Sequence, residues 1–496
     1  MEDEKINSHL NTLRVLFIAA EAEPFIKVGG LGDVAGSLPL ALRSVPSEII
    51  NDFHIDARLV IPFHPFISLE KFQAEKISSF SVQSRNGPVL AEVFQINLKG
   101  MPVYLISGEP VLAGKSVYSQ DTLQDGDKYI FFSRAVLELC NQLDWKPDIL
   151  HVNDWHTAVI PEILRSNRHL YPSIAAAKAV LTIHNLPFMG AGIEDSLERF
   201  QIPPSNDPSL PLWARHFPLT MGLAAADQIV AVSPHYAAEL FTEEFGCGLQ
   251  SFFDSHASIT KGILNGIDIQ TWNPENDRLI QNNFSSKNLE SRAANREILI
   301  REFQLDMNPE IPLLTYIGRM DVQKGVDLLL DTLPQMMDQN WQAIIIGTGA
   351  EDLERKCRQL ESSLPDRVRA VIRFDSALSH RLYAGADMIV IPSRYEPCGL
   401  VQMIAMRYGC VPVAHAVGGL VDTITDHPKN AGTTGFLFPE PSAKSLKKGL
   451  IRSIRSYSKK ELWTKIQMNG MEKDFSWDAS ATAYVKIYLG LIGEKV

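Results

Sequence analysis

The sequence predicts an α/β protein with two Rossmann-like domains, in which helices cover parallel sheets. The first observation is size: 496 residues, 45% of them hydrophobic, exceed what one core normally organises. The second is that short apolar runs alternate with helix-compatible stretches in both halves. The third is a polar stretch over about residues 274–308, followed by a new apolar run at 313–317. We therefore expect two domains facing each other across a deep cleft.

The first half begins with an apolar run, 13–20, that is typical of a buried strand. The helix expected next, 33–44, contains Pro39, which predicts a kink or a late start because proline has no backbone N–H. Further strands are expected at 179–183 and 228–232. These elements form the sheet of an N-terminal domain.

The second half repeats the alternation of strands and helices. Its expected strands are 313–317, 343–346, 368–374, 388–391 and 411–414. With the polar stretch as the connection, we expect a flexible tail over 1–11, an N-terminal domain over 12–290 and a C-terminal domain over 291–474.

Composition narrows the class of protein. A formal net charge of −11 argues against nucleic acid or an anionic membrane as a partner. The five cysteines are never spaced as C-x-x-C, which favours free thiols in a reducing compartment and gives no zinc site. Residues 1–11 lack the apolar stretch of a secretory signal, and no apolar run reaches membrane-spanning length. We expect a cytoplasmic protein, or a plastid protein if a transit peptide has been removed.

A glycine-rich turn, residues 27–34 (KVGGLGDV), follows the first strand. Glycines at a strand's carboxyl end let backbone N–H groups approach an anion, and Lys27 adds a positive charge. The expected ligand is a phosphate or the hydroxyls of a sugar. The spacing is neither G-x-G-x-x-G nor the Walker pattern, so a turn without a ligand is the alternative.

Polar clusters follow other strands of the first half. Residues 148–157 bring His151, Asn153, Asp154 and His156 together with Trp155, whose flat ring suits a sugar. Residues 182–185 (TIHN) have the same form after the next strand, and residues 263–268 offer Asn265 and Asp268 at a turn. The alternatives are a packed tryptophan with a satisfied histidine, and ordinary Asn-Gly turn chemistry.

Two loops of the second half carry charge at strand ends. Residues 318–325 hold Arg319 and Lys324, and a guanidinium fork beside an ammonium suits a diphosphate. Residues 393–401 hold Glu396, which suits sugar hydroxyls, and lead into a helix whose amides form another anion site. The loop 418–420 (GGL) repeats this device. Solvated surface charge is the alternative for the two cations.

Taken together and in order, these motifs resemble the bacterial glycogen synthase and plant starch synthase family, retaining glycosyltransferases of the GT-B fold. The resemblance runs from about Leu13 to the end of the chain. It rests on Lys-x-Gly-Gly-Leu-Gly-Asp-Val, Asp-Trp-His, Thr-Ile-His-Asn-Leu, Ile-Leu-Asn-Gly-Ile-Asp, Gln-Lys-Gly, Tyr-Ala-Gly-Ala-Asp, Glu-Pro-Cys-Gly-Leu and Gly-Gly-Leu-x-Asp-Thr. It also implies that residues 475–496 form a helix that crosses back and packs on the N-terminal domain.

The resemblance implies transfer of glucose from ADP-glucose to the non-reducing 4-hydroxyl of an α-1,4-glucan, such as glycogen or a malto-oligosaccharide, with retention of anomeric configuration. It implies no metal and no cofactor. A covalent intermediate would need paired carboxylates about 5 Å apart. Glu396 is the one obvious candidate nucleophile, so we expect front-face attack.

Matching positions carry the expected roles. The catalytic residues are Glu396, Arg319, Lys324 and His156. The donor-binding residues are Lys27, Gly29, Gly30, Asp33, Asn265, Tyr383, Cys398, Gly399, Leu400 and Val401, with Tyr383 as the aromatic near the adenine. The residues on the acceptor or sugar side are Glu21, Asn185 and Asp154.

Departures from the family pattern leave alternatives open. Residues 184–190 (HNLPFMG) lack the Tyr and Gln that the family often has there, and Val401 replaces a common Thr. The alternatives are a GT-B transferase that uses UDP-glucose or another acceptor, and a catalytically silent glucan-binding homologue. A phosphorylase of similar architecture would need a pyridoxal phosphate lysine.

Overall fold

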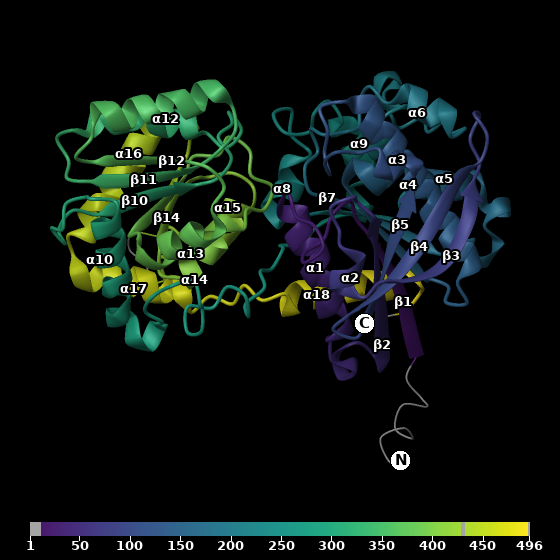
Figure 1. The fold of residues 1–496 in the computed structure, drawn as a ribbon, viewed down its shortest axis with the longest axis horizontal. Coiled ribbons are helices and arrows are strands. Elements are labelled where there is room, and N and C mark those ends of the chain that lie inside the picture. The colour runs from purple at the N-terminus through teal and green to yellow at the C-terminus, as the bar shows by residue number, and fades with distance from the viewer. Residues whose placement is uncertain (1–10, 428–431, 495–496) are drawn as a thin grey trace, which may run out of the picture. The chain divides into compact units, whose positions relative to one another are not determined.

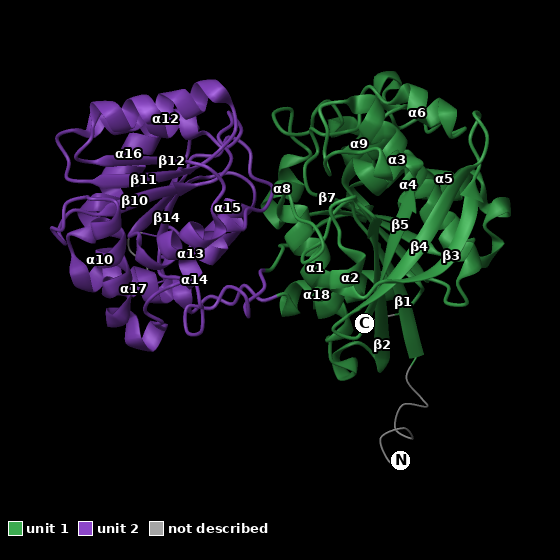
Figure 2. Cartoon of the chain, in the orientation of Figure 1, with its two compact units in different colours: residues 1–266, 477–496 green, residues 267–476 purple. Residues whose placement is uncertain are grey.

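The computed structural model describes residues 11–427 and 432–494. The chain divides into two compact units, each with its own hydrophobic core (Figure 2). Unit 1 comprises residues 1–266 and 477–496, and unit 2 comprises residues 267–476. Most of the predicted tail, 1–10, lies outside the described residues, and Asn11 already begins the first strand.

Unit 1 contains a nine-stranded sheet in the order β3-β4-β5-β2-β1-β6-β7-β8-β9 (Figure 1). Its strands are β1 (Asn11–Ile18), β2 (Phe53–Pro62), β3 (Glu75–Val82), β4 (Val89–Leu98), β5 (Met101–Gly108), β6 (Ile149–Asn153), β7 (Lys178–Ile183), β8 (Gln228–Ala231) and β9 (Thr260–Gly262). From β5 to β9 the neighbouring strands are parallel, as predicted.

The edge formed by β3, β4 and β5 is antiparallel, which the sequence analysis did not predict. Lys99 and Gly100 connect β4 to β5 with φ angles of 50° and 84°. Two positive φ angles in a two-residue connection are the geometry of a tight hairpin, and glycine adopts it without steric cost.

The helices of unit 1 are α1 (Gly30–Arg43), α2 (Leu69–Phe72), α3 (Glu109–Leu112), α4 (Thr122–Gln142), α5 (Asp154–Ser166), α6 (Glu194–Arg199), α7 (Pro218–Ala225), α8 (Pro234–Glu239), α9 (Gln250–Ser255) and α18 (Asp478–Leu491). Alternate residues of β1, namely Leu13, Val15 and Phe17, share one core with α1 and α18. Leu16 and Ile18 are buried on the opposite face, because successive strand residues point to opposite sides.

The predicted return of the C-terminal segment is confirmed, since α18 belongs to unit 1 and lies beside α1 (Figure 1). Tyr488 of α18 shares a 2.6 Å hydrogen bond with His151 of β6. The Ser480 hydroxyl donates to the Leu264 carbonyl at 2.5 Å. Residues 495–496 of this segment lie outside the described residues.

Helix α1 differs from the expected 33–44. It begins at Gly30, and it continues through Pro39 to Arg43, so the late start is wrong. Proline removes one intrahelical hydrogen bond, but Pro39 is buried in the core, and that burial offsets the loss.

Unit 2 contains a six-stranded, fully parallel sheet in the order β12-β11-β10-β13-β14-β15. Its strands are β10 (Leu313–Ile317), β11 (Gln342–Gly347), β12 (Val368–Ile372), β13 (Met388–Ile391), β14 (Val411–His415) and β15 (Phe436–Phe438). Its helices are α10 (Arg292–Glu302), α11 (Val326–Thr332), α12 (Glu351–Ser363), α13 (Ser376–Gly385), α14 (Val401–Arg407), α15 (Gly419–Thr423), α16 (Ala443–Tyr457) and α17 (Lys460–Met471). Counted along the chain this order is 3-2-1-4-5-6, so the predicted Rossmann-like architecture is confirmed.

The units meet in sequence at residues 266 and 267, earlier than the predicted boundary at 290. Residues 267–290 belong to unit 2 because their side chains pack against that unit. The Trp272 ring stacks on His380 with centroids 4.1 Å apart. Asp277 accepts a 2.7 Å hydrogen bond from the Tyr408 hydroxyl and pairs with His380 at 2.7 Å. At the other end, unit 1 resumes at Trp477 rather than at 475.

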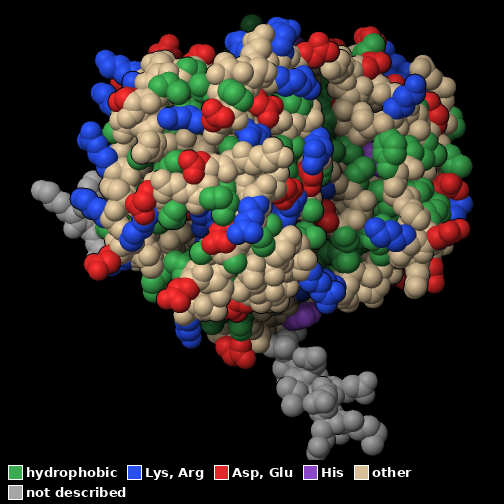
Figure 3. Space-filling view, turned by 60° about the vertical axis from the view of Figure 1, so that its left-hand side comes forward, with side chains coloured by type: hydrophobic (Ala, Val, Ile, Leu, Met, Phe, Trp, Pro, Cys, Tyr) green, Lys and Arg blue, Asp and Glu red, His purple; other side chains and the backbone are tan. Residues whose placement is uncertain are grey.

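The surface carries charges of both signs. On the face drawn in Figure 3, Lys and Arg side chains are interspersed with Asp and Glu side chains. Within the described ranges, none of the helices has the length and apolar character needed to cross a membrane.

Candidate active site

In unit 2 the strand order reverses beside β10, which pairs with β11 on one side and β13 on the other. At such a point the loops at the carboxyl ends of the two central strands diverge and form a ligand-binding crevice. These loops are 318–325 after β10 and 392–400 after β13. The Arg394 amide donates to the Gln323 carbonyl at 2.8 Å, so the two loops are joined.

An ion pair between Lys324 and Glu396 also joins the two loops. The Lys324 Nζ donates to the two carboxylate oxygens of Glu396 at 2.8 and 2.7 Å. The Ser393 hydroxyl donates to Glu396 Oε2 at 2.8 Å. The Glu396 carboxylate is therefore buried, neutralised and hydrogen-bonded on both oxygens.

Backbone contacts fix the same pair. The Lys324 amide donates to Asp321 Oδ1 at 2.7 Å. The Ser393 carbonyl accepts a hydrogen bond from the His415 ring at 2.7 Å. Lys324 and Glu396, which were expected to have separate roles, thus form one ion pair in the structure.

Arg319 lies on the loop after β10 with 60% of its side chain exposed. Its guanidinium pairs with Asp321 at 3.2 Å, and the Tyr316 hydroxyl donates to its carbonyl at 2.6 Å. A guanidinium has five N–H donors, so most of them remain for an anionic ligand.

The loop 418–420 was expected to bind an anion, but in the structure it supports Glu396. Gly418 has φ +47°, and a Cβ there would lie 2.1 Å from the Glu396 carbonyl oxygen. The Gly419 amide donates to that carbonyl at 3.1 Å. Glycine is required at position 418 because both the backbone angle and the space exclude a side chain.

The segment 398–401 follows Glu396 after one residue, Pro397. Cys398 is buried, Leu400 precedes the first turn of α14, and Val401 begins that helix. The Gln402 side-chain amide donates to the carbonyls of Cys398 and Gly399, each at 2.9 Å. The segment's backbone is thus held in place beside the ion pair.

Tyr383 does not join this group. It lies near the end of α13, shortly before β13 begins, and therefore toward the amino edge of the sheet. Its ring is buried and packs against Trp272 and Tyr408, with centroids 5.8 and 6.3 Å apart. The resemblance had assigned Tyr383 to the adenine.

An exposed aromatic side chain lies instead at the carboxyl edge. Phe374 follows β12 by two residues and is 84% exposed, although it had been expected to end that strand. A large exposed ring is the signal that identifies it, and burial cannot be read from the sequence.

Unit 1 has its own reversal of strand order, beside β1, which pairs with β2 and β6. The chain after β1 carries Glu21 and the glycine-rich turn, and β6 leads directly into α5 with Asp154 and His156. Two of the predicted clusters therefore start from neighbouring strands at one edge of the sheet.

Glu21 occupies the backbone amides that were expected to bind an anion. Its buried carboxylate accepts hydrogen bonds from the amides of Val28 and Gly29, the latter at 3.1 Å. The Tyr118 hydroxyl donates to Glu21 Oε1 at 2.9 Å. Burial raises the pKa of the Glu21 carboxyl, and these hydrogen bonds oppose that rise.

Lys27 and Asp33 form an ion pair at 2.6 Å across the same turn. Gly29 lies just before α1, and Gly30 is the first residue of that helix. A Cβ at Gly32 would lie 3.0 Å from the Lys27 side chain and 3.2 Å from Glu21 Oε2. The glycines thus give Lys27 and Glu21 room to approach the helix start.

His156 is buried among aromatic rings, with the centroids of Trp155, Tyr129 and Tyr118 at 4.3, 4.6 and 4.9 Å. Its Nδ1 atom has no hydrogen-bond partner among the described residues. Burial lowers the pKa of His156 well below its ordinary value, and the charge of Lys128 lowers it further. The imidazole is therefore neutral at pH 7.

Asp154 holds the loop after β7. Its Oδ1 accepts hydrogen bonds from the amides of His184 and Asn185 at 2.7 and 3.2 Å. Burial raises the pKa of Asp154 to about 7 and lowers that of His184 to about 3. His184 Nε2 shares a 2.9 Å hydrogen bond with the Asn153 amide oxygen, which joins the two clusters.

Two other predicted polar residues have structural partners. His151 is satisfied by the hydroxyls of Tyr488 and Thr182, at 2.6 and 2.7 Å. Asp268 accepts hydrogen bonds from the amides of Gln270 and Thr271, at 2.9 and 3.2 Å, as ordinary turn chemistry predicts.

Three of the predicted site residues of unit 1 carry a buried polar atom without a partner among the described residues. These atoms are His156 Nδ1, Asn185 Oδ1 and Asn265 Oδ1. Nearly all buried polar atoms of folded proteins are hydrogen-bonded, so such atoms suggest a ligand that supplies hydrogen-bond donors. Sugar hydroxyls are donors of this kind.

Sequence reasoning missed Tyr118 and Ser393, which bind Glu21 and Glu396 respectively. Tyr118 lies in no predicted motif, and Ser393 lies in the predicted loop 393–401, but nothing in the sequence indicates that its hydroxyl contacts Glu396. In residues 11–427 and 432–494, no three His, Cys, Asp or Glu side chains are grouped so that they could hold a metal ion.

Family models match both units. Residues 14–255 match the starch synthase catalytic domain, and residues 298–469 match the glycosyl transferases group 1 model. A glycogen synthase of Clostridium perfringens is 36% identical over 487 residues, which covers 97% of this chain and 98% of that protein. A glycogen synthase of Lactiplantibacillus plantarum is 37% identical over 487 residues, with 97% and 99% covered.

Solved structures agree with these matches. The catalytic domain of starch synthase IV from Arabidopsis thaliana, bound to ADP and acarbose, has a TM-score of 0.87 at 29% identity, covering 98% of this chain and 100% of that one. Sucrose-phosphate synthase from Thermosynechococcus elongatus, at 19% identity and a TM-score of 0.62, shares the fold. Because the relatives match over nearly their whole length, the chain belongs to the glycogen synthase and starch synthase family and is a glycosyltransferase of the GT-B fold.

Proposed function

We propose that this glycosyltransferase transfers glucose from ADP-glucose to the non-reducing 4-hydroxyl of an α-1,4-glucan, with retention of anomeric configuration and without a metal ion or other cofactor. One observation carries the proposal: the likeness to a starch synthase bound to ADP and acarbose extends over 98% of this chain. The glycogen synthases among its relatives support the same acceptor.

In this proposal Arg319 and Lys324 hold the diphosphate of the donor. Departure of ADP builds negative charge on the diphosphate, and preorganised cations stabilise that charge. Arg319 is exposed on the loop after β10. Lys324 gives two of its three N–H donors to Glu396, and its third has no partner among the described residues, so it suits a phosphate oxygen. Two cations can supply the charge stabilisation that a divalent metal gives elsewhere.

The state of Glu396 favours front-face attack. Both Glu396 oxygens accept hydrogen bonds from Lys324 or Ser393, and such bonds lower the nucleophilicity of a carboxylate. In the proposed step, the bond between glucose C1 and the diphosphate oxygen breaks. A bond from C1 to the acceptor O4 forms on the same face, and the acceptor's proton goes to the departing phosphate. Glu396 then orients sugar hydroxyls.

Unit 1 supplies acceptors for sugar hydroxyls. The amide oxygens of Asn185 and Asn265 are unused buried acceptors, and Nδ1 of the neutral His156 ring is an unused buried nitrogen that accepts or donates according to its tautomer. Glu21, Asp33, Asp154 and Lys27 hold the loops around them. In this proposal unit 2 binds the nucleotide-sugar, and unit 1 binds the glucan while also contributing donor contacts from Lys27, Asp33 and Asn265.

Phe374 is our candidate for stacking on the nucleobase, in place of Tyr383. Its exposed ring lies at the carboxyl edge of the unit 2 sheet, as do the Arg319 and Glu396 loops. An aromatic face stacks on any base, so this contact adds affinity without choosing between adenine and uracil.

The test is incorporation of labelled glucose into glycogen, from ADP-glucose and separately from UDP-glucose, with a chelator present. We expect incorporation from ADP-glucose that resists the chelator. Preference for UDP-glucose would overturn the proposal that ADP-glucose is the donor. Loss of activity with chelator would overturn the proposal that no metal ion is required. Folded protein that uses neither donor would indicate another acceptor or a silent glucan-binding role.

A further inference from the structure

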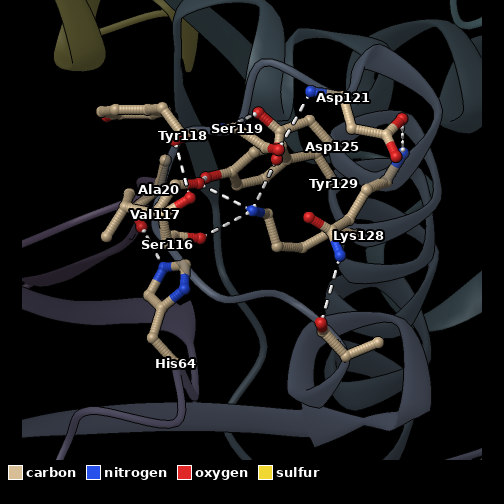
Figure 4. A network of polar contacts seen from close by, with 12 residues as sticks. Ala20, His64, Ser116, Val117, Tyr118, Ser119, Asp121, Asp125, Lys128 and Tyr129 are labelled. Atoms are coloured by element: carbon tan, nitrogen blue, oxygen red, sulfur yellow. Dashed lines mark hydrogen bonds and ion pairs between the residues drawn. The ribbon is translucent and has the colours of Figure 1, made fainter.

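Glu21 is held by a residue outside the predicted motifs. Tyr118, in the loop between α3 and α4, donates its hydroxyl to the Glu21 carboxylate at 2.9 Å. On the other side, the buried His64 ring donates to the carbonyl of Ala20, the residue before Glu21, at 2.9 Å (Figure 4). The position of Glu21 on the glycine-rich turn therefore depends on where the Tyr118 loop is fixed.

Lys128 of α4 binds this loop just before Tyr118. Its Nζ donates to the carbonyl of Val117 at 2.7 Å and to that of Ser116 at 3.1 Å (Figure 4). The Tyr129 hydroxyl donates to the same Val117 carbonyl at 2.5 Å. Two donors from adjacent helix positions thus fix one backbone carbonyl next to Tyr118.

Asp125 binds the loop just after Tyr118. Its Oδ2 accepts a 2.7 Å hydrogen bond from the Ser119 amide, and its Oδ1 pairs with Lys128 Nζ at 2.7 Å (Figure 4). Lys128 and Asp125 are about one helical turn apart on α4, which places their side chains on the same face, and they form an ion pair. This pair, which we call the Tyr118 clamp, grips the backbone on both sides of Tyr118.

The burial of Lys128 is the unusual feature. Its side chain is 0% exposed, and all three N–H donors are used, by Asp125, Ser116 and Val117. A buried ion pair often stabilises a fold no more than apolar side chains of the same volume would. What an apolar side chain would not do is bind the loop's carbonyls, so the charge serves to fix the loop.

The same loop forms a wall of the His156 pocket. The Tyr118 ring centroid lies 4.9 Å from that of His156, and the Tyr129 centroid lies 4.6 Å away. The charged group of Lys128 disfavours protonation of His156. A shift of the clamp would therefore disturb both Glu21 and His156.

We propose that Lys128, paired with Asp125, is a positioning residue of the transferase site: it fixes Tyr118 on Glu21, and thereby fixes Glu21 on the amides of Val28 and Gly29. The effect on turnover rests on the proposed function. Small displacements of positioned groups reduce rates strongly.

The activity test is a double-mutant cycle with Lys128→Met and Tyr118→Phe. Each variant is expected to lower kcat about 10-fold or more, with a smaller change in KM. Because Lys128 acts through Tyr118, the double variant should match the weaker single variant within about twofold. Independent, multiplicative losses would overturn the inference.

Lys146→Met is the matched control. Lys146 lies just beyond the other end of α4 and donates to the carbonyls of Cys140, Asn141 and Leu143. Like Lys128→Met, this substitution removes a lysine that binds backbone carbonyls, but the lysine lies at the end of α4 that is far from Tyr118. Thermal unfolding should shift in both variants, whereas kcat should fall in Lys128→Met alone. An equal loss of kcat in both would show a general structural effect and overturn the inference.

Hydrogen exchange separates this inference from the proposed function, because it needs no substrate. Amides over 116–119 should exchange faster in Lys128→Met than in wild type or Lys146→Met. Unchanged exchange there overturns the clamp whatever the activity, whereas a wild type without transferase activity overturns the proposed function alone. If Lys128→Met fails to fold, Asp125→Asn, which keeps the side chain's volume, is measured in the same way.

Discussion

Lys324 and Glu396 are 72 positions apart in sequence, yet the Lys324 ammonium lies 2.7 Å from one Glu396 carboxylate oxygen and 2.8 Å from the other. They come from the loops after two neighbouring parallel strands, β10 and β13. The cation expected on the diphosphate and the carboxylate expected on the sugar therefore form one unit, in which each fixes the position of the other.

The pair should be coupled in stability. We expect Lys324→Met to cost about 1–3 kcal/mol, because it leaves the buried Glu396 carboxylate without its cation. Adding Glu396→Gln should recover part of that loss, and urea unfolding of both single variants and the double variant measures the coupling. The control is Lys460 with Glu310, a surface pair at 3.4 Å, where we expect at most about 0.5 kcal/mol. Additive losses at Lys324 and Glu396 would contradict the account.

Gly418→Ala should displace the loop that carries Glu396. The new Cβ would meet the Glu396 carbonyl oxygen at 2.1 Å, so the Glu396 loop must move. Gly100→Ala is the control, because Gly100 also has positive φ, +84°, but nothing lies within 4 Å of its added Cβ. Both variants should lose about 1 kcal/mol from backbone strain. Gly418→Ala should lose more and should also lose activity, and equal effects in the two variants would contradict this role.

Asp154 predicts a specific pH dependence of stability. Burial raises its pKa from 3.8 to about 7 in the folded protein. The folded state therefore holds a proton that the unfolded state releases, so this stabilisation is full below pH 3.8 and is lost as pH rises through about 7. Asp154→Asn does not titrate, so its unfolding free energy should fall less between pH 5 and pH 8. Parallel curves for wild type and variant, measured in urea, would count against the shift.

Phe374 and Tyr383 can be distinguished by two substitutions. Phe374→Ala should raise the KM for the nucleotide-sugar about 10-fold, because base stacking contributes about 1–3 kcal/mol. Its stability should hardly change, since the ring is 84% exposed. Tyr383→Ala should instead lose about 3–5 kcal/mol of stability, as buried aromatic side chains do. A higher KM in a stable Tyr383→Ala protein, with Phe374→Ala normal, would restore the original assignment.

The fold was predictable where apolar runs are continuous. Strands at 313–317 and 388–391 have the observed bounds, because both faces of a parallel sheet are buried and such a strand is a continuous apolar run in the sequence. The antiparallel β3–β5 edge was missed, since β3 is mostly exposed, β4 is partly exposed and the Lys99-Gly100 turn is a weak signal. The unit boundary was misplaced because polar residues of 267–290 pack on unit 2 through Trp272 and Asp277.

The site was predictable as a set of loops but not as a set of contacts. Glycines and charges after strands marked Lys27, Arg319 and Glu396 correctly as strand-end residues. Which side chains pair is decided by tertiary structure, so sequence could not show that Glu21 takes the turn's amides. Tyr118 carries no motif at all, and its role follows from one hydrogen bond.

The measurement that tests the central claim most directly is glucose transfer from ADP-glucose to glycogen by wild type, Glu396→Gln and the surface control Glu310→Gln, with chelator present and folding verified. The account predicts that wild type and Glu310→Gln transfer glucose at similar rates, and that Glu396→Gln loses at least about 100-fold in kcat. Full activity in Glu396→Gln would contradict the claim that the Lys324 and Glu396 pair is the centre of the donor site.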